Sequence, residues 1–213
     1  MLDALGPDIS VVQEVARPST ESDQCLWFGD NPRQGIAITT SGEYRVERLP
    51  TARNVPKFVF PVLITGPVTF SLLAVWAKTG QKHSYVEAVV QAAKLYRSLI
   101  ESGPTVLIGD LNSNANWDRA HPKDRNHSAL IKLLSKLGLV SAYHTHFNEE
   151  HGAESAPTYY FLWKHSRPYH MDYCFLPEHW ANQITKVEVS PYQGSERLSD
   201  HRPVIVDVLP SAG

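Results

Sequence analysis

An acid and an amide follow a buried-strand pattern near the middle of the chain. In TVLIGDLNSN, residues 105–114, the apolar run ends at Asp110, and Asn112 comes two residues later. Residues two apart on an extended backbone point to the same side. A carboxylate and a carboxamide on one side can share a hard cation and its bound water. A plain turn explains the same pattern, because Asp and Asn favour turns by bonding their own backbone.

Three further strand ends carry groups of the same chemistry. DISVVQEV ends in Glu14, YHMDYCFLP contains Asp172, and RLSDHRPVIVDV places Asp200 and His201 before an apolar strand. A carboxylate beside a buried strand costs stability unless it is paired, and an acid that orients an imidazole prepares it for proton transfer. The alternatives are a surface role for Glu14, since most glutamates are exposed, and structural roles for the others.

Several side chains are candidates for contacting a substrate. Trp76 and Lys78 share a face at a strand end, where they could stack on a base and contact a phosphate. His170 lies two residues before Asp172, which predicts the same face for both side chains. The loop after residue 112 contains Asn114 and Arg119, and it directly follows the strand end that carries Asp110 and Asn112. A capped strand end and a solvated loop are the alternatives, because single exposed charges signify little.

Short strand patterns dominate the rest of the chain, and two segments have helical periodicity. Apolar residues repeat at helical spacing within residues 84–102 and 127–137. The strand-like runs, rich in Val, Ile, Phe and Tyr, are residues 9–13, 25–28, 35–39, 43–49, 58–64, 70–76, 105–108, 158–161, 171–176, 184–189 and 203–208. Many strands with few helices predict two packed sheets with helices outside. We expect one domain over residues 1–213, because no linker interrupts the pattern.

Composition limits the class of protein. The 213 residues are 42% hydrophobic with a net charge of −2, which fits a globular chain and argues against binding polyanions over the whole surface. Cys25 and Cys174 are far apart, so neither a disulfide scaffold nor a thiolate zinc site is expected. No apolar run reaches the ~20 residues of a membrane span, and the N-terminus lacks a signal-peptide pattern. These features predict a cytoplasmic protein.

Taken in order, the motifs resemble the endonuclease/exonuclease/phosphatase superfamily, which includes exonuclease III, DNase I and inositol polyphosphate 5-phosphatases. The matching residues are Gln13-Glu14, GDLN at 109–112, Thr158 in PTYY, Asp172 in MDY, and SDH at 199–201. The resemblance covers nearly the whole chain. It implies an α/β fold, a four-layer α/β/β/α sandwich of the DNase I-like type, and phosphoester hydrolysis that depends on Mg²⁺ or Mn²⁺.

The resemblance also implies a role for each matched residue. Glu14 and Asp200 resemble metal ligands, and Asp110 resembles the carboxylate that positions or deprotonates the attacking water. Asn112 is similar to the amide that holds the phosphate and that acid. His201 resembles the histidine that contacts the scissile phosphate, with Asp172 as its orienting partner.

The chain departs from the family pattern in two places. The family's first core strand, with its Asn-containing motif, would precede MLDALGPDIS, and we expect its absence to leave backbone groups unpaired. We therefore expect weak or no activity and a possible homodimer that covers the gap; restoring an upstream strand tests this. Relatives also place a Tyr or His near residue 76, where Trp76, Lys78 or His83 stands here.

Three functions remain open. The first is a metal-dependent nuclease acting on nucleic acid, and the second is a phosphatase or phosphodiesterase for a small-molecule or lipid phosphoester. The third is an inactive truncated member that acts as a binding protein. The histidines at 144, 146, 151, 165 and 170 suggest a zinc module, but their spacing matches no known zinc pattern, and the hard-cation set explains more residues.

Overall fold

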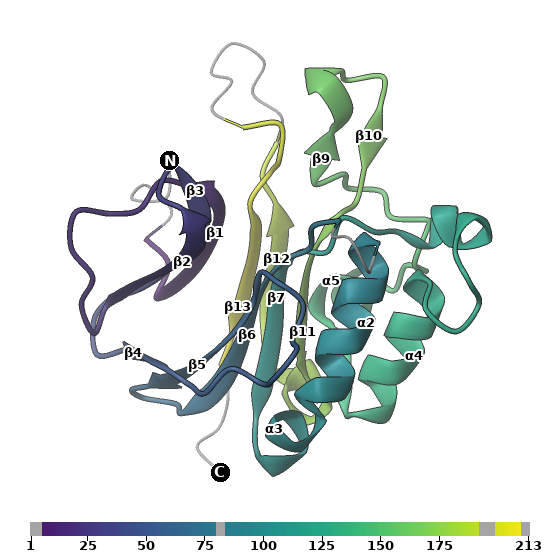
Figure 1. The fold of residues 1–213 in the computed structure, drawn as a ribbon. Helices are drawn as coiled ribbons and strands as arrows, with labels where there is room; N and C mark the ends of the chain where they lie inside the picture. The colour runs from purple at the N-terminus through teal and green to yellow at the C-terminus, as the bar shows by residue number, and fades with distance from the viewer. Residues whose placement is uncertain (1–5, 80–83, 192–198, 210–213) are drawn as a thin grey trace.

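A central six-stranded sheet organises the chain. The computed structural model describes residues 6–79, 84–191 and 199–209 (Figure 1). The strand order is β4-β5-β6-β7-β11-β8, and only the β6–β7 pair is parallel. Because β6 and β7 are parallel, both end at one edge of the sheet, where antiparallel β11 begins. The strands are β4 (Arg45–Arg48), β5 (Val59–Thr65), β6 (Phe70–Trp76), β7 (Thr105–Asp110), β8 (Leu139–Ser141) and β11 (Asp172–Pro177).

Two smaller sheets pack against one face of the central sheet. One has the order β1-β3-β2, with β1 (Ile9–Val15), β2 (Cys25–Asn31) and β3 (Gln34–Thr40), and the other pairs β12 (Ile184–Val189) with β13 (Val204–Val208). Alternating side chains of the facing sheets form an apolar core between them. Its buried members include Ile36, Ile38, Leu72, Ala74, Trp76, Cys174, Leu176, Trp180 and Val187.

Strands β1 and β13 line opposite sides of one cavity of about 780 Å³ that reaches the inner face of the central sheet. Within the described residues, β1 pairs only with β3 and β13 pairs only with β12. The backbone groups on the other edge of each strand therefore have no strand partner in the described part of the chain.

Helices cover the opposite face of the central sheet (Figure 1). The apolar stripe of α2 (Tyr85–Leu95), which includes Val86, Val89 and Ala93, packs with α4 (His127–Lys136) onto β6, β7 and β11. The predicted helix over 84–102 divides at Tyr96, whose φ of −91° and ψ of 12° separate α2 from α3 (Arg97–Ser102). The described residues thus form a mixed α/β sandwich, with helices on one face of the central sheet and the smaller sheets on the other, which confirms the predicted α/β fold class.

Shorter elements complete the structure. A short hairpin of β9 (Tyr159–Tyr160) and β10 (Pro168–Tyr169) extends beyond the central sheet (Figure 1). The strand predicted over 158–161 is shorter than expected, because Leu162 and Trp163 have positive φ and turn the chain into η2 (Phe161–Trp163). The sequence analysis missed α5 (Ala142–Phe147), η1 (Ala115–Ala120) and η3 (Glu178–Gln183). In the described ranges, every helix is too short or too polar to cross a bilayer.

Candidate active site

Asp110 and Asn112 meet at the end of β7. Asp110 is 4% exposed, and its carboxylate accepts the backbone N–H of Asn112 at 2.8 Å and the side-chain amide of Asn112 at 2.6 Å. The same amide donates to the carbonyl of Ala77 at 3.1 Å, which ties the ends of β7 and β6 together. The two side chains pair as predicted, but through a turn and not through strand alternation, because Asn112 has a φ of 47°.

The glycine before Asp110 allows the two sheets to approach each other. Gly109 has a φ of 137°, and a Cβ there would lie 2.0 Å from the carbonyl oxygen of Val75 and 2.7 Å from the amide nitrogen of Gln13. That amide of Gln13 donates to the carbonyl of Val75 at 3.2 Å, so it links β1 to β6. Only glycine leaves room for this link. The bond fixes the strand that carries Glu14.

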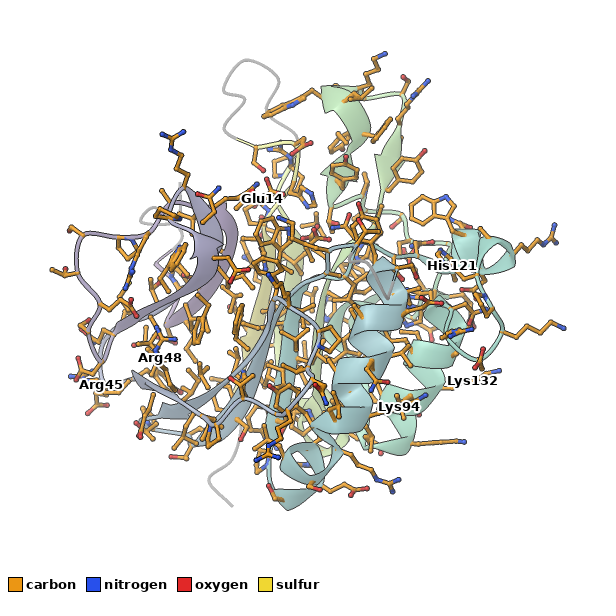
Figure 2. All side chains as sticks on the ribbon, in the orientation of Figure 1. Glu14, Arg45, Arg48, Lys94, His121 and Lys132 are labelled. Carbon is orange, nitrogen blue, oxygen red and sulfur yellow. The ribbon has the colours of Figure 1, made fainter. Side chains whose placement is uncertain are left out.

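Glu14 reaches the same cavity from a bulge in β1. It has a φ of 59°, and the β1–β3 register shifts between Gln13 and Val15, which is how a bulge re-aims a side chain. The carboxylate of Glu14 accepts the side-chain amide of Gln34 at 3.1 Å. Figure 2 shows Glu14 on the side of its sheet that faces the central strands. Glu14 and Asp200 line one cavity with Asp110, Asp172 and His201.

Asp172 and His201 form a hydrogen-bonded pair next to Asp110. Nδ1 of His201 lies 2.8 Å from Oδ2 of Asp172, and Asp172 is directly opposite Asp110 in the β11–β7 register. One ligand atom from each of these three residues lies within 4.8 Å of the others. The ring of Tyr159 is 4.5 Å from the imidazole of His201. Segments far apart in sequence therefore bring an acid, a second acid and an imidazole together.

Thr158 holds the backbone under this pair. Its side chain is fully buried, and its hydroxyl oxygen accepts the backbone N–H of Met171 at 2.9 Å and of Asp172 at 3.0 Å. The carbonyl of Thr158 also accepts the backbone N–H of Arg202 at 2.6 Å. One residue thus connects the strand of Asp172 to the segment of His201. The motif PTYY gave a signal for this residue in the sequence, although its role as a positioning residue was not predicted.

The charges in the cavity perturb one another. Burial raises the pKa of Asp110 well above its usual range, and the charges of Asp172 and Glu14 raise it further, although His201 opposes them. Burial by itself would lower the pKa of His201, but the charge and hydrogen bond of Asp172, with Asp110 and Asp200, raise it to about 9. The imidazole is therefore a cation at neutral pH in a cavity dominated by carboxylates.

The structure places Trp76 differently from the prediction. Trp76 is 2% exposed and belongs to the core between the sheets, because its position on β6 directs it inward. It has no open face on which a base could stack. Lys78 does meet Trp76, as their two-residue spacing predicts, with Nζ 3.6 Å from the indole centroid. His83, the remaining candidate here, lies outside the described residues.

Asn114 and His170 are both 3% exposed. The amide of Asn114 donates to Glu154 at 3.0 Å, to the carbonyl of His170 at 3.2 Å and to the hydroxyl of Tyr173 at 3.2 Å. Asn114 also lines the second pocket described next, so its contact with a substrate stays a prediction. The ring of His170 packs against Tyr143 and Tyr173 in the interior.

Arg119 is exposed on η1, beside a second pocket of about 400 Å³ that reaches Asn112. The sequence analysis did not predict this pocket, because its aromatic side chains come from separate segments. In the sequence, the pocket is signalled only by Tyr159, which lies in PTYY, and by Trp117, which lies in the loop after Asp110. The aromatic lining consists of Tyr85, Trp117, Tyr159, Phe161 and Tyr169.

The chain has a DNase I-like fold, similar in structure to solved nucleases and a phosphatase. One similar solved structure is a single-residue variant of the 3′ phosphatase NExo from Neisseria bound to product DNA hairpin, with a TM-score of 0.70 and 18% identity over 97% of this chain and 92% of that one. The AP endonuclease LMAP from Leishmania major has a TM-score of 0.66 and 14% identity over 98% of this chain and 80% of that one.

The 3′-5′ exonuclease NExo from Neisseria meningitidis is similar to the same degree, with a TM-score of 0.68 and 19% identity over 95% of this chain and 89% of that one. No protein-family profile matches the chain, and no curated protein sequence does. At these identities, the likeness establishes the fold, and the chemistry has to be argued from the site.

Proposed function

We propose that the chain is a divalent-metal-dependent phosphoester hydrolase that cleaves phosphodiester bonds in nucleic acid. The observation that carries the proposal is the convergence of the Asp110–Asn112 pair and the Asp172–His201 pair in one cavity with Glu14. These groups come from β1, β7, β11 and the segment before β13. In-line displacement at a phosphate needs positioning and positive charge more than covalent chemistry, and this set of groups supplies both.

Each pair has a distinct task in this proposal. His201 uses Nδ1 in its bond to Asp172, so Nε2 is the ring nitrogen that can donate to a phosphate oxygen. Its raised pKa keeps the donor protonated at neutral pH, which favours the charge that develops in the transition state. Asp110 has a raised pKa, which suits a general base that must take a proton from water near neutral pH. The amide of Asn112 holds that carboxylate in place.

The residues in the cavity fit a hard divalent cation such as Mg²⁺ or Mn²⁺. Their donor atoms are carboxylate oxygens, which these ions prefer, and the carboxyl groups of Glu14, Asp110, Asp172 and Asp200 all line the cavity. Glu14 and Asp200 would hold the ion, since Asp110 and Asp172 are already bonded to Asn112 and His201. When bound, the cation supplies charge at the phosphate oxygens and lowers the pKa of water.

The aromatic pocket favours a substrate that carries a base. It opens beside Asn112 and contains Trp117 and Tyr169, whose rings are 5.0 Å apart. Aromatic side chains contribute about 1–3 kcal/mol for each base that stacks on them. The similar structures include a 3′ phosphatase bound to a product DNA hairpin, an exonuclease and an AP endonuclease. The first alternative is hydrolysis of a small-molecule phosphoester, and the second is a binding role without catalysis.

The test compares hydrolysis of plasmid DNA, single-stranded DNA and a generic aryl phosphodiester, with Mg²⁺ and with a chelator. We expect chelator-sensitive cleavage of at least one DNA substrate in preference to the aryl ester. Asp110→Asn and His201→Ala should each lower turnover by about 10²–10³-fold, the usual cost of removing one preorganised group. The matched controls are Asp124→Asn and His179→Ala, two exposed residues outside the cavity.

Three results would contradict the proposal. Cleavage that is unaffected by the chelator would exclude the metal mechanism. A wild-type rate in His201→Ala would exclude the role of the Asp172–His201 pair. Preference for the aryl ester or for a lipid phosphoester over every nucleic acid would select the phosphatase alternative. Circular dichroism of each variant establishes that a lost rate does not reflect a lost fold.

A further inference from the structure

A second cluster of titratable side chains lies behind the active site, among α4, α5 and the segment 148–156. It contains His127, His144, His151 and Glu154, and the proposed hydrolysis uses none of them. Nε2 of His144 is 3.1 Å from a carboxylate oxygen of Glu154, and Nε2 of His127 is 3.2 Å from Nδ1 of His151. The rings of His144 and His151 stack with their centroids 3.5 Å apart. One ligand-type atom from each of His144, His151 and Glu154 lies within 4.8 Å of the other two, and His127 lies beside them.

We propose that His144, His151 and Glu154 bind a zinc ion, with a water molecule in the fourth position. One ligand atom from each of the three residues lies within 4.8 Å of the other two. With bonds of 2.0–2.1 Å to a tetrahedral zinc, neighbouring ligand atoms lie about 3.3 Å apart. The 3.1 Å between Nε2 of His144 and a carboxylate oxygen of Glu154 matches that spacing. Because the rings of His144 and His151 are stacked, one of them has to turn for both lone pairs to point at the ion.

The partners behind these side chains are those of metal-bound histidines. Such histidines use the second ring nitrogen in a bond that fixes the tautomer and the orientation of the ring. Nδ1 of His144 lies 2.7 Å from the hydroxyl of Ser141, and its other ring nitrogen, Nε2, faces Glu154. The second carboxylate oxygen of Glu154 accepts the amide of Asn114 at 3.0 Å.

The electrostatics of the cluster are suited to a cation. The side chains of His144 and Glu154 are 9% and 3% exposed, so bulk water does not compete for their donor atoms. Two imidazole nitrogens and a carboxylate oxygen are a donor set for zinc.

A buried nitrogen beside the cluster lacks a partner. His170 is 3% exposed, and its ring centroid is 6.0 Å from that of His144. Its Nδ1 lies 2.8 Å from the carbonyl oxygen of Ala156 and donates to it, which leaves Nε2 with a lone pair. Among the described residues, this buried Nε2 has no hydrogen-bond partner. An unsatisfied buried acceptor is destabilising, and a water molecule bound to a cation in the cluster would offer it a donor.

Imidazole donors distinguish this site from the oxygen-lined cavity of the active site. Imidazole suits zinc and other transition metals, whereas carboxylate sets suit Mg²⁺ and Ca²⁺. The zinc would join α5 to segment 148–156, which follows it directly in the sequence. Through Glu154 and Asn114 it would also support the carbonyl of His170. The proposed role is structural, and it does not depend on the proposed hydrolysis.

The test uses tag-free protein of the full chain, stripped with a chelator, reloaded with Zn²⁺ and passed through gel filtration before metal analysis. We expect about one retained zinc per chain in the wild type and a rise in melting temperature with Zn²⁺. Glu154→Gln and His151→Asn should lose both. Cobalt(II) should give the visible absorption of a tetrahedral centre in the wild type only. Ser141→Ala should weaken zinc binding by about 10–100-fold, as is typical for loss of an outer partner.

Two controls separate this site from the active site. His146→Gln changes an exposed histidine on the same helix, two residues from His144, and Glu14→Gln removes a proposed ligand of the hydrolytic cation. Both should retain the zinc and the cobalt spectrum. If Glu154→Gln and His151→Asn bind as much zinc as the wild type, or if only Glu14→Gln loses it, the proposal is wrong. If either of those variants fails to fold, the Ser141→Ala affinity decides, and an unchanged value overturns the proposal.

Discussion

The substitution Thr158→Val removes one hydroxyl on which two buried donors depend. Thr158 is fully buried, and its oxygen accepts the backbone N–H groups of Met171 and Asp172 at 2.9 and 3.0 Å. Valine has nearly the same shape, so the substitution leaves no cavity. It leaves both N–H groups without an acceptor in a place that water does not reach. The cost is therefore almost entirely the cost of unsatisfied hydrogen bonds.

The expected loss of stability follows from the number of donors left without an acceptor. Each buried donor without a partner costs about 1–3 kcal/mol, so the pair predicts a loss of about 2–6 kcal/mol in the free energy of unfolding. Domains of this kind are stable by only about 5–15 kcal/mol, so the loss should shift a urea midpoint clearly. Thr158→Ser keeps the acceptor and loses one methyl group, which predicts a loss of about 1 kcal/mol.

The control for this prediction is Thr185→Val. Thr185 is exposed, and its hydroxyl donates to the carbonyl of Asp207 at 3.2 Å, so the change should stay within about 0.5 kcal/mol. Equal urea midpoints for Thr158→Val and Thr158→Ser would refute the reasoning. If the proposed hydrolysis is correct, Thr158→Val should also lower the rate at temperatures where it is folded, because Asp172 moves and no longer aligns His201.

Three more predictions concern single positions. Gly109→Ala should destabilise the fold by about 2–5 kcal/mol in urea unfolding, from backbone strain and overpacking, because its Cβ would meet the carbonyl oxygen of Val75; a midpoint like that of the wild type would contradict the tight approach of β6 and β7. Burial raises the pKa of Cys174 to about 12, so at pH 8 the thiol is protonated and shielded. Mass spectrometry should therefore find iodoacetamide on Cys25 without urea, and on Cys174 only after urea is added. Early modification of Cys174 would contradict its placement in the core. Glu14→Gln should raise the Mg²⁺ concentration for half-maximal cleavage by about tenfold or more, equivalent to about 1.4 kcal/mol, and an unchanged requirement would remove Glu14 from the metal site.

Local patterns in the sequence predicted much of the fold. Runs of Val, Ile and Phe between turn residues identified most strands, because a strand buried on both faces needs apolar side chains along its whole length. The stripe through Val86, Val89 and Ala93 identified α2, because a helix that packs on a sheet needs apolar side chains along one face. Boundaries were less accurate where backbone conformation decides them. The break at Tyr96 and the positive φ of Leu162 have no distinctive residue type to announce them.

The sequence by itself determined which groups were available for chemistry: acids, an amide and a histidine beside strand ends. Only the tertiary structure decided which of them meet, because strand register and sheet packing set distances between segments up to about 190 residues apart in the printed sequence. Packing made Trp76 a core residue, turned Asn114 toward Glu154, and gathered histidines whose spacing fits no zinc motif. The tertiary structure also decided the charge that each group carries, because burial and neighbouring charges act through space.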